Sequence, residues 1–421
     1  MGRAIPIALS WVIAAACGGP SGSPPEAVST AAALELAAIE FERPARSGEP
    51  NLHAAPDGTA LLTWLEPAEG DDWALRLSRR SDTGWSDPVT IRRTDRFFVN
   101  WADFPSSVQM EGGTIAVHWL EKVAASTYAY HVMLATSSDG GASWSAPFRA
   151  HRDESPTEHG FVSMVPWEGG AAIAWLDGQD MYDPDAESPS DDGGHGGGSG
   201  GAMSVRFTTL APDGRLGAEV LLDPRSCECC QTALATTGHA LIAAYRDRSP
   251  EEVRDIAVVR GIGETWSEPS HVSADAWTIP GCPVNGPQLV AAGEEVAAAW
   301  YTGAGGDPQV YAAFSRDGGQ TFGTRIRIDE GLPMGRVDIE RLDDGSVLVT
   351  WLEASDDRAR VLVRRVSPRG GVGEAVVITE TDGARASGFP RMVRLGGELL
   401  FAWTLPGDGG GIRVRSARIT D

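Results

Sequence analysis

The sequence predicts an all-β protein with the architecture of a seven-bladed β-propeller, and three observations support this fold class. Seven short apolar segments each end in an aromatic residue, and they lie at 60–64, 115–119, 171–175, 241–245, 296–300, 347–351 and 399–403. The aromatic residues recur at intervals of 51 to 56 residues, with one interval of 70. Apolar segments and glycine-centred turns flank each of them, which gives four strands per repeat. Four strands at this period are typical of propeller blades, and a six-bladed propeller is the alternative.

The elements of a repeat follow in a fixed order. In the first repeat, the turn Pro56-Asp57-Gly58 precedes the aromatic strand, and the third and fourth strands are predicted at 74–78 and 88–92. Later repeats have third strands at 130–136, 256–260, 310–315 and 360–366 and a fourth strand at 324–328. The last repeat ends at 412–419 with a third strand only. We therefore expect the apolar segment 34–41 to complete that blade, because ring closure removes an exposed sheet edge.

The first residues predict export. Arg3 precedes an apolar run at 5–16 that is too short to span a bilayer and ends in Ala14-Ala15-Ala16-Cys17. Small residues before a cysteine resemble the lipobox of bacterial lipoproteins, although Ala14 stands where leucine is usual. The resemblance implies lipidation of Cys17 and three regions: a signal peptide at 1–16, a flexible tether at 17–32 and the propeller at 33–421. An ordinary secretory signal is the alternative.

The charge of the chain limits its partners. The formal net charge is −23 and the isoelectric point is about 4.7. An acidic surface repels phosphate groups, which argues against nucleic acid and anionic membrane surfaces as partners. We expect an exported monomer in the bacterial cell envelope, at the outer membrane or the periplasmic face, attached to the membrane by its lipid only.

Two turns between third and fourth strands share the pattern S-x-D-x-G-x-[ST]-[WF]. Their defining residues are Ser137, Asp139, Gly141 and Trp144 in one turn and Ser315, Asp317, Gly319 and Phe322 in the other. In such a turn the aspartate hydrogen-bonds the backbone, the glycine permits a positive φ and the aromatic ring packs under the hairpin. The pattern resembles the Asp box of sialidases and related BNR-repeat propellers. This resemblance implies a propeller whose Asp-box turns lie away from its active face.

The opposite face is predicted to carry the loops that join second to third strands and the junctions between blades. The candidate ligand-face residues in these loops are Trp101, Asp103, His151, His159, Arg246, Asp247, Arg254, Asp255, Trp277 and Asn285. The arginines and aspartates are expected either to brace the loops as ion pairs or to clamp a carboxylate or sulfate. An insertion at 178–201, rich in Asp, Gly and Ser, is predicted either to be disordered or to act as a lid or metal-binding arm.

Cys227, Cys229, Cys230 and Cys282 occupy two consecutive blade junctions and are therefore expected to lie together on this face. Two disulfides are one interpretation, since exported proteins favour them, although three cysteines within four residues make the geometry difficult. The second is a thiolate site for copper or zinc, with His151 or His159 as further ligands. Redox-active thiols are the third.

The resemblance to sialidases also implies a Tyr–Glu nucleophilic pair, an aspartic acid/base and three arginines that bind a carboxylate. The sequence departs from that family at Phe41-Glu42-Arg43-Pro44, where Glu42 replaces the arginine of the F/Y-R-I-P motif, and in having seven repeats. We therefore predict a binding or scaffold protein whose face takes a glycan, metal or protein ligand. A sialidase-like glycoside hydrolase is the alternative. Convergence of a tyrosine, a glutamate and three arginines near the axis would favour the enzyme.

Overall fold

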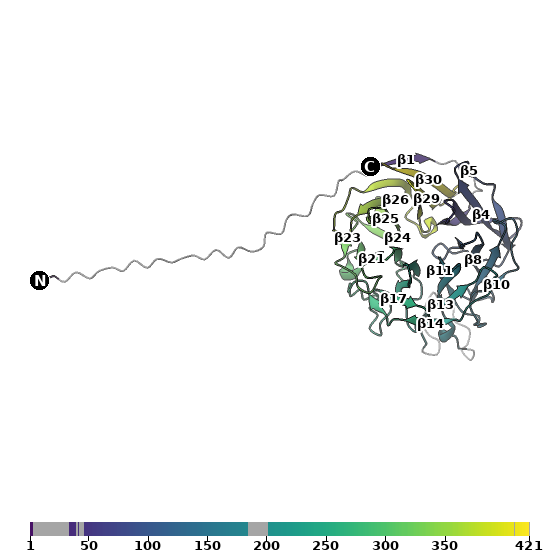
Figure 1. The fold of residues 1–421 in the computed structure, drawn as a ribbon, viewed down its shortest axis with the longest axis horizontal. Helices are drawn as coiled ribbons and strands as arrows, with labels where there is room; N and C mark the ends of the chain where they lie inside the picture. The colour runs from purple at the N-terminus through teal and green to yellow at the C-terminus, as the bar shows by residue number, and fades with distance from the viewer. Residues whose placement is uncertain (3–32, 39–40, 42–45, 184–200, 408, 421) are drawn as a thin grey trace.

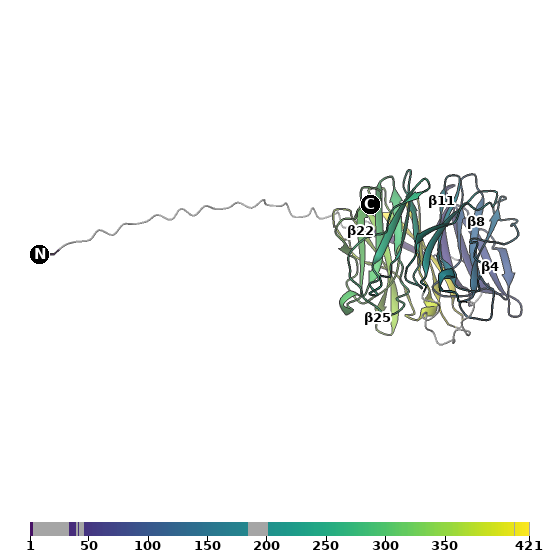
Figure 2. The same ribbon diagram turned by 90° about the horizontal axis from the view of Figure 1, so that it is seen from below.

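The computed structural model describes residues 1–2, 33–38, 41, 46–183, 201–407 and 409–420. Within these residues the strands form seven antiparallel sheets arranged as a ring (Figure 1), which confirms the seven-bladed β-propeller. The strands run from one face of the ring to the other (Figure 2). The predicted signal peptide after residue 2, Cys17, the tether, most of the insertion and residues Glu42 to Pro44 lie outside the described residues.

The strands of each blade follow one another from the axis outward. Blade 1 contains β2 (Gly48–Ala54), β3 (Ala60–Pro67), β4 (Trp73–Ser81), β5 (Gly84–Trp85) and β6 (Val89–Thr94). Blade 2 contains β7 (Ser106–Gln109), β8 (Ile115–Lys122), β9 (Tyr130–Ser137) and β10 (Phe148–Arg149). Blade 3 contains β11 (His159–Trp167), β12 (Gly170–Asp177), β13 (Ser204–Leu210) and β14 (Val220–Asp223). Blade 4 contains β15 (Ala233–Thr236), β16 (Leu241–Arg246), β17 (Ile256–Ile262), β18 (Thr265–Trp266) and β19 (Ser270–His271).

The remaining blades repeat this order. Blade 5 contains β20 (Gln288–Ala292), β21 (Glu295–Thr302), β22 (Gln309–Ser315) and β23 (Ile326–Arg327). Blade 6 contains β24 (Pro333–Arg341), β25 (Val347–Ser355), β26 (Arg358–Val366) and β27 (Val376–Thr381). Blade 7 contains β28 (Arg391–Leu395), β29 (Glu398–Leu405) and β30 (Gly411–Thr420). Three 3-10 turns lie in loops, η1 (Gln179–Met181), η2 (Ala304–Gly306) and η3 (Arg385–Ser387). None of the helical turns in the described part of the chain has the length and apolar composition needed to cross a membrane.

The N-terminal strand closes the ring. Strand β1 (Ala33–Ala38) pairs antiparallel with β30 in the register Leu34 to Ile419, and it lies on the outer rim of blade 7 (Figure 1). This confirms that the segment near residue 34 completes the last blade. Without it, the backbone groups of β30 would form an open sheet edge.

The apolar core is divided among the gaps between neighbouring blades. Between blades 7 and 1, for example, Leu62 and Trp64 of β3 pack with Leu400 and Ala402 of β29. Every other pair of adjacent blades encloses a comparable cluster. Because burial of apolar area is the main stabilising contribution, each blade depends on both of its neighbours.

The aromatic residue near the end of each second strand is buried and, in six blades, bonds a carboxylate. The indole N–H groups of Trp64, Trp119, Trp175 and Trp351 donate to Glu66, Glu121, Asp177 and Glu353, each two residues further along the strand, over 2.7 to 3.2 Å. Trp300 donates to Asp275, and the Tyr245 hydroxyl donates to Asp223. Both of these carboxylates come from an earlier part of the chain. A buried indole N–H left without a partner would cost about 1–3 kcal/mol, which accounts for the repeated carboxylate.

The two Asp-box turns have the hydrogen bonds that their residue types predict. In the first, Asp139 accepts from the Ser143 backbone N–H over 2.9 Å, and Ser137 accepts from the Gly141 N–H over 2.8 Å. Asp317 and Ser315 make the equivalent bonds in the second turn. Gly141 and Gly319 have φ values of 99° and 83°, a region that favours glycine.

The closure of the ring by β1 can be tested by truncating the chain. A chain that begins at residue 39 lacks β1, and its melting temperature is expected to fall by several degrees, on the order of 5 °C, because the half-buried Leu34 and Leu36 lose their packing. A chain that begins at residue 33 keeps β1 and serves as the control. Thermal unfolding followed by circular dichroism measures the difference, and equal melting temperatures would contradict the role assigned to β1.

Candidate functional site

A cavity of about 630 Å³ opens near the axis, on the face formed by the blade junctions. Its walls come from junction residues 100–102, 158–161, 228–229 and 280–284, from Arg385 and from the loops that precede β9 and β17. Tyr130 at the start of β9 lines the cavity, whereas the Asp box follows the other end of the same strand. The cavity and the Asp boxes therefore lie on opposite faces of the ring.

A second, narrower space of about 280 Å³ is lined by the first strands of all seven blades. Gln231 lines this channel and ties three blade junctions together. Its side-chain N–H donates to the Ala102 carbonyl over 2.7 Å, and its side-chain oxygen accepts from the Gly286 N–H over 3.0 Å. A Cβ at Gly286 would meet the Gln231 backbone at 2.0 Å, so the close approach of these two junctions requires glycine.

The structure brings the four cysteines together at one wall of the cavity. The Cys227 sulfur lies 3.3 Å from that of Cys230 and 3.9 Å from that of Cys229, and Cys229 also hydrogen-bonds Cys282. Cys229 and Cys282 line the cavity, whereas Cys227 and Cys230 are buried behind them. No disulfide joins cysteines within the described residues.

A network of two arginines and two glutamates surrounds the cysteine loop. Arg254 donates to the Cys227 sulfur over 3.1 Å, to Glu228 over 2.9 Å and to Glu252 over 2.8 Å. Arg248 bonds the same two glutamates, at 2.7 Å for Glu252. Arg254 and Glu228 are almost fully buried, and a buried charge of this kind persists only when it is paired. The network thus braces the loop, with glutamates as the partners of Arg254 in place of the expected aspartates.

The environment of Cys227 favours its thiolate. Burial alone would raise the pKa of Cys227, but hydrogen bonds from Cys229 and Cys230, together with the charge of Arg254, lower that pKa well below its ordinary value. The pKa of Cys229 is raised because its thiol proton is donated to the neighbouring sulfur, and burial raises the pKa of Cys230. One thiolate with two thiol donors is the resulting arrangement.

Of the ten predicted ligand-face residues, Trp101 and Arg254 line the cavity. Arg246 instead donates to the backbone carbonyls of Asn285, Arg254 and Tyr301 and lies over the Trp277 ring. Asp255 accepts from the backbone N–H groups of Ala276 and Trp277, and Asp247 pairs with His271. Asn285 accepts from the Arg336 N–H. These side chains hold the junctions in place, because loop backbone groups need partners once they are buried.

Tyr130 and Glu158 meet at the wall of the cavity that is formed by blade 2 and the junction after it. The Tyr130 hydroxyl donates to Glu158 over 2.6 Å, and its ring stacks on Phe98 with the centroids 4.1 Å apart. Asp103, which is wholly buried, accepts from the Phe161 N–H over 2.8 Å and packs against Gly160. Burial raises the pKa of Asp103 well above its ordinary value, and the nearby Glu158 adds to the effect. Burial and the charge of Glu158 likewise raise the pKa of Tyr130.

Three arginines, Arg248, Arg254 and Arg385, also line the cavity. Arg385 is exposed and forms no ion pair with another described residue. Tyr130, Glu158, Glu228 and Arg385 were not among the predicted site residues. The signal that could have indicated Tyr130 and Glu158 is their position, since one begins a third strand and the other directly precedes a first strand on the predicted face.

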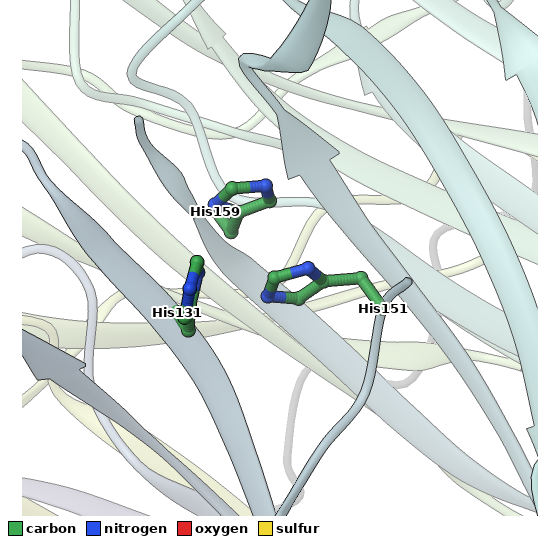
Figure 3. A group of neighbouring side chains, drawn as sticks. All are labelled: His131, His151 and His159. Atoms are coloured by element: carbon green, nitrogen blue, oxygen red, sulfur yellow. The ribbon is translucent and has the colours of Figure 1, made fainter. Parts of the chain in front are cut away.

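The two predicted histidines do not join the cysteines. His151 and His159 instead form a separate buried group with His131 of β9 (Figure 3). The reason is that the His159 ring is held between blades 2 and 3, where it hydrogen-bonds the Tyr130 carbonyl over 3.1 Å and Asp153 over 3.0 Å.

No protein-family model and no curated protein matches the sequence. Among solved structures, a protein of unknown function from Dyadobacter fermentans is 16% identical, with a TM-score of 0.50, over 92% of this chain and 98% of that one. An ulvan lyase, which is a polysaccharide lyase, is 12% identical, with a TM-score of 0.50, over 77% of this chain and 80% of that one. The NanB sialidase of Streptococcus pneumoniae is 12% identical, with a TM-score of 0.46, over 86% of this chain and 83% of that one. At these identities the likeness concerns the fold.

Proposed function

We propose that this protein is a glycan-active enzyme of the glycoside hydrolase type, with its reaction centre at Tyr130 and Glu158. The observation that supports the proposal is the 2.6 Å hydrogen bond from the Tyr130 hydroxyl to the Glu158 carboxylate, in a cavity that three arginines also line. A tyrosine is a weak nucleophile until a neighbouring base removes its proton, and a carboxylate at this distance can do so. This arrangement favours the hydrolase over a binding or scaffold protein.

The substrate class follows from the charges and aromatic rings of the cavity. Arg248 and Arg254 are already paired with Glu228 and Glu252, whereas Arg385 is available to a ligand anion. Trp101 and Tyr128 provide ring surface on which a sugar can pack. A sugar that carries one carboxylate fits this combination. The polysaccharide lyase with the same fold gives further support for a carbohydrate ligand.

The proposed reaction adds one water across a glycosidic bond. The Tyr130 oxygen bonds the anomeric carbon as the glycosidic C–O bond breaks, and the Tyr130 proton passes to Glu158. A cavity water protonates the departing oxygen. The hydroxide that remains attacks the anomeric carbon, and Tyr130 leaves and regains its proton from Glu158. The covalent intermediate divides one difficult substitution into two easier ones.

The proposal predicts the effect of two substitutions. Tyr130→Phe removes the nucleophile, and Glu158→Gln removes the base, so each is expected to lower kcat by about 100-fold or more. The measurement is hydrolysis of methylumbelliferyl glycosides of sialic acid, of uronic acids and of neutral sugars. Acidic glycosides are the expected substrates, and Arg385→Ala is expected to raise KM for them.

Tyr182→Phe is the matched control, because Tyr182 is exposed and does not line the cavity. It should retain the activity of the unsubstituted protein. A folded protein that hydrolyses no glycoside of the panel would contradict the proposal, as would full activity in Tyr130→Phe.

The cysteine group supports a second function, the binding of copper as Cu(I). We infer it from three buried sulfurs, those of Cys227, Cys229 and Cys230, which lie within 4.8 Å of one another. Soft thiolates prefer Cu(I), with Zn(II) as the other candidate. A cluster of thiolates around Cu(I) is anionic, and Arg254 beside Cys227 offsets that charge. The metal would also hold the loop whose Glu228 orients the two arginines.

This inference predicts one equivalent of Cu(I) per chain in protein reconstituted under reducing conditions. Cys230→Ser removes a buried sulfur and is expected to lower the affinity at least about 10-fold. The measurement is competition with a colorimetric Cu(I) chelator, and Ser226→Ala, which leaves the sulfurs in place, is the control. Affinity for Cu(I) that is unchanged in Cys230→Ser would exclude the site.

We also propose that the protein is exported and anchored by a lipid on Cys17, as the lipobox-like Ala14-Ala15-Ala16-Cys17 suggests. Cys17→Ser is expected to move the protein from the membrane fraction to the soluble fraction of a bacterial host, because a lipid-free chain has no anchor. Cell fractionation and immunoblotting measure the distribution, with Cys282→Ser as the control. An unchanged distribution of Cys17→Ser would count against lipidation.

A further inference from the structure

The group His131, His151 and His159 lies in the gap between blades 2 and 3, apart from the cysteines. His131 belongs to β9, His151 follows β10 and His159 begins β11, so three separate segments converge (Figure 3). The three side chains are at most 7% exposed. One nitrogen from each ring lies within 4.8 Å of the other two.

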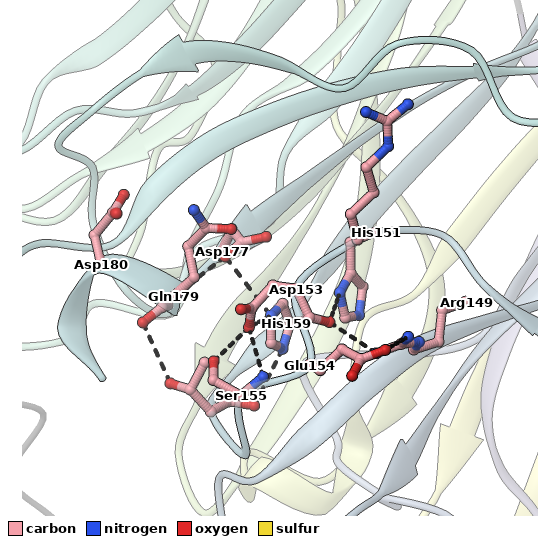
Figure 4. Close-up of polar contacts among 12 residues, drawn as sticks. Arg149, His151, Asp153, Glu154, Ser155, His159, Asp177, Gln179 and Asp180 are labelled. Carbon is pink, nitrogen blue, oxygen red and sulfur yellow. Dashed lines mark hydrogen bonds and ion pairs between the residues drawn. The ribbon is translucent and has the colours of Figure 1, made fainter. Parts of the chain in front are cut away.

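The hydrogen bonds determine which nitrogens have lone pairs. Nδ1 of His151 lies 3.1 Å from the Asp153 carbonyl, and Nδ1 of His159 lies 3.1 Å from the Tyr130 carbonyl (Figure 4 shows the first of these contacts). A carbonyl oxygen only accepts, so both Nδ1 atoms carry the proton. Neutral rings with this tautomer present a bare Nε2. A backbone carbonyl on the other ring nitrogen is also the usual arrangement for a histidine that binds a metal.

Two of the nitrogens have no partner. Nε2 of His151 and Nδ1 of His131 are buried and form no hydrogen bond within the described part of the chain. Leaving a buried polar atom unsatisfied costs about 1–3 kcal/mol, so two such atoms at one place need an explanation.

The contact of His159 with Asp153 points to a cation. The Nε2 atom of His159 lies 3.0 Å from the Asp153 carboxylate and 3.7 Å from that of Asp177 (Figure 4). With the proton of His159 on Nδ1, both Nε2 and the carboxylate are acceptors and would repel each other. A positive charge between them, either a second proton or a metal ion, removes the conflict.

We propose that His131, His151, His159 and Asp153 form a site for a divalent transition metal, with Zn²⁺ as the expected ion. Three imidazoles and one carboxylate are a ligand set typical of zinc, whereas Ca²⁺ and Mg²⁺ prefer all-oxygen ligands. The metal satisfies both unpartnered nitrogens and the His159–Asp153 contact at once. Zn–N bonds of about 2.0–2.1 Å require the rings to move closer together and to reorient, because the His151 and His159 rings are stacked in parallel with their centroids 3.9 Å apart. These contacts indicate a metal whether or not the protein is a hydrolase.

The role of the site follows from the segments it joins. Its ligands come from β9, from the loop after β10 and from the first residue of β11, so the metal would link blade 2 to blade 3. With all four ligands supplied by the protein, no position remains for a substrate, which is typical of a structural zinc site.

The test uses the full protein with Cys227, Cys229, Cys230 and Cys282 changed to Ser, so that sulfur cannot contribute. After chelator treatment this protein is expected to bind one equivalent of Zn²⁺ in isothermal titration calorimetry and to melt at a higher temperature with Zn²⁺ than without it. His151→Ala in the same background is expected to lower the affinity at least about 100-fold. His239→Ala is the matched control, because His239 is exposed, and it should bind Zn²⁺ as before.

A second measurement applies if the serine variant does not fold. Co²⁺ added to the otherwise unsubstituted protein should give tetrahedral d–d absorption without sulfur-to-metal charge-transfer bands at the first equivalent, and His131→Ala should abolish that signal. A folded protein that binds no Zn²⁺ would refute the site. Binding that persists in both His151→Ala and His131→Ala, or a first equivalent of Co²⁺ bound through sulfur, would also refute it.

Discussion

The structure depends on a buried aromatic residue that bonds a carboxylate at the end of the second strand of most blades. The aromatic ring fills the gap between blades, and its polar hydrogen requires an acceptor at the same depth. In blades 1, 2, 3 and 6 the acceptor lies where the strand leaves the blade for the cavity face, so there the bond that completes the core also fixes the start of a face loop. In blade 3 this acceptor is Asp177, which lies 3.7 Å from His159. The aromatic–carboxylate pair of blade 3 therefore lies next to the proposed histidine site.

The fold could be predicted because this constraint is periodic. Aromatic residues at a near-constant interval reveal the number of blades, and the absence of a fourth strand after residue 411 indicates where closure must occur. The cysteine cluster and Arg254 could be located because register alone places them on one face. Tyr130 and Glu158 could not be paired in this way. They lie 28 residues apart and meet through an isolated parallel bridge between the start of β9 and the junction before β11. A contact between a third strand and the junction that follows its blade leaves no period-2 pattern in the sequence.

The histidine group, too, could be predicted only in part from the sequence. The sequence places His151 and His159 in one junction, on the same predicted face as the cysteines, and therefore suggests them as ligands of the cysteine site. The deciding residue, His131, belongs to a strand whose sequence is otherwise an ordinary apolar segment. Its significance is visible only when the unsatisfied nitrogens of His131 and His151 are found facing the same gap. Partnerless buried atoms are a property of packing, and no pattern in a single sequence contains them.

The two sites are linked by adjacent residues. Tyr130 directly precedes His131, and Glu158 directly precedes His159. Tyr130 and Glu158 line the cavity, and Tyr130 also packs with Trp175 in the apolar cluster between blades 2 and 3, while His131 and His159 meet His151. The Tyr130 carbonyl also accepts from His159 over 3.1 Å. Any cation that draws the two histidines together fixes the backbone on which the Tyr130–Glu158 hydrogen bond depends. A buried site between blades would in this way set the geometry of a pair that lines the cavity, without contacting the ligand of that pair.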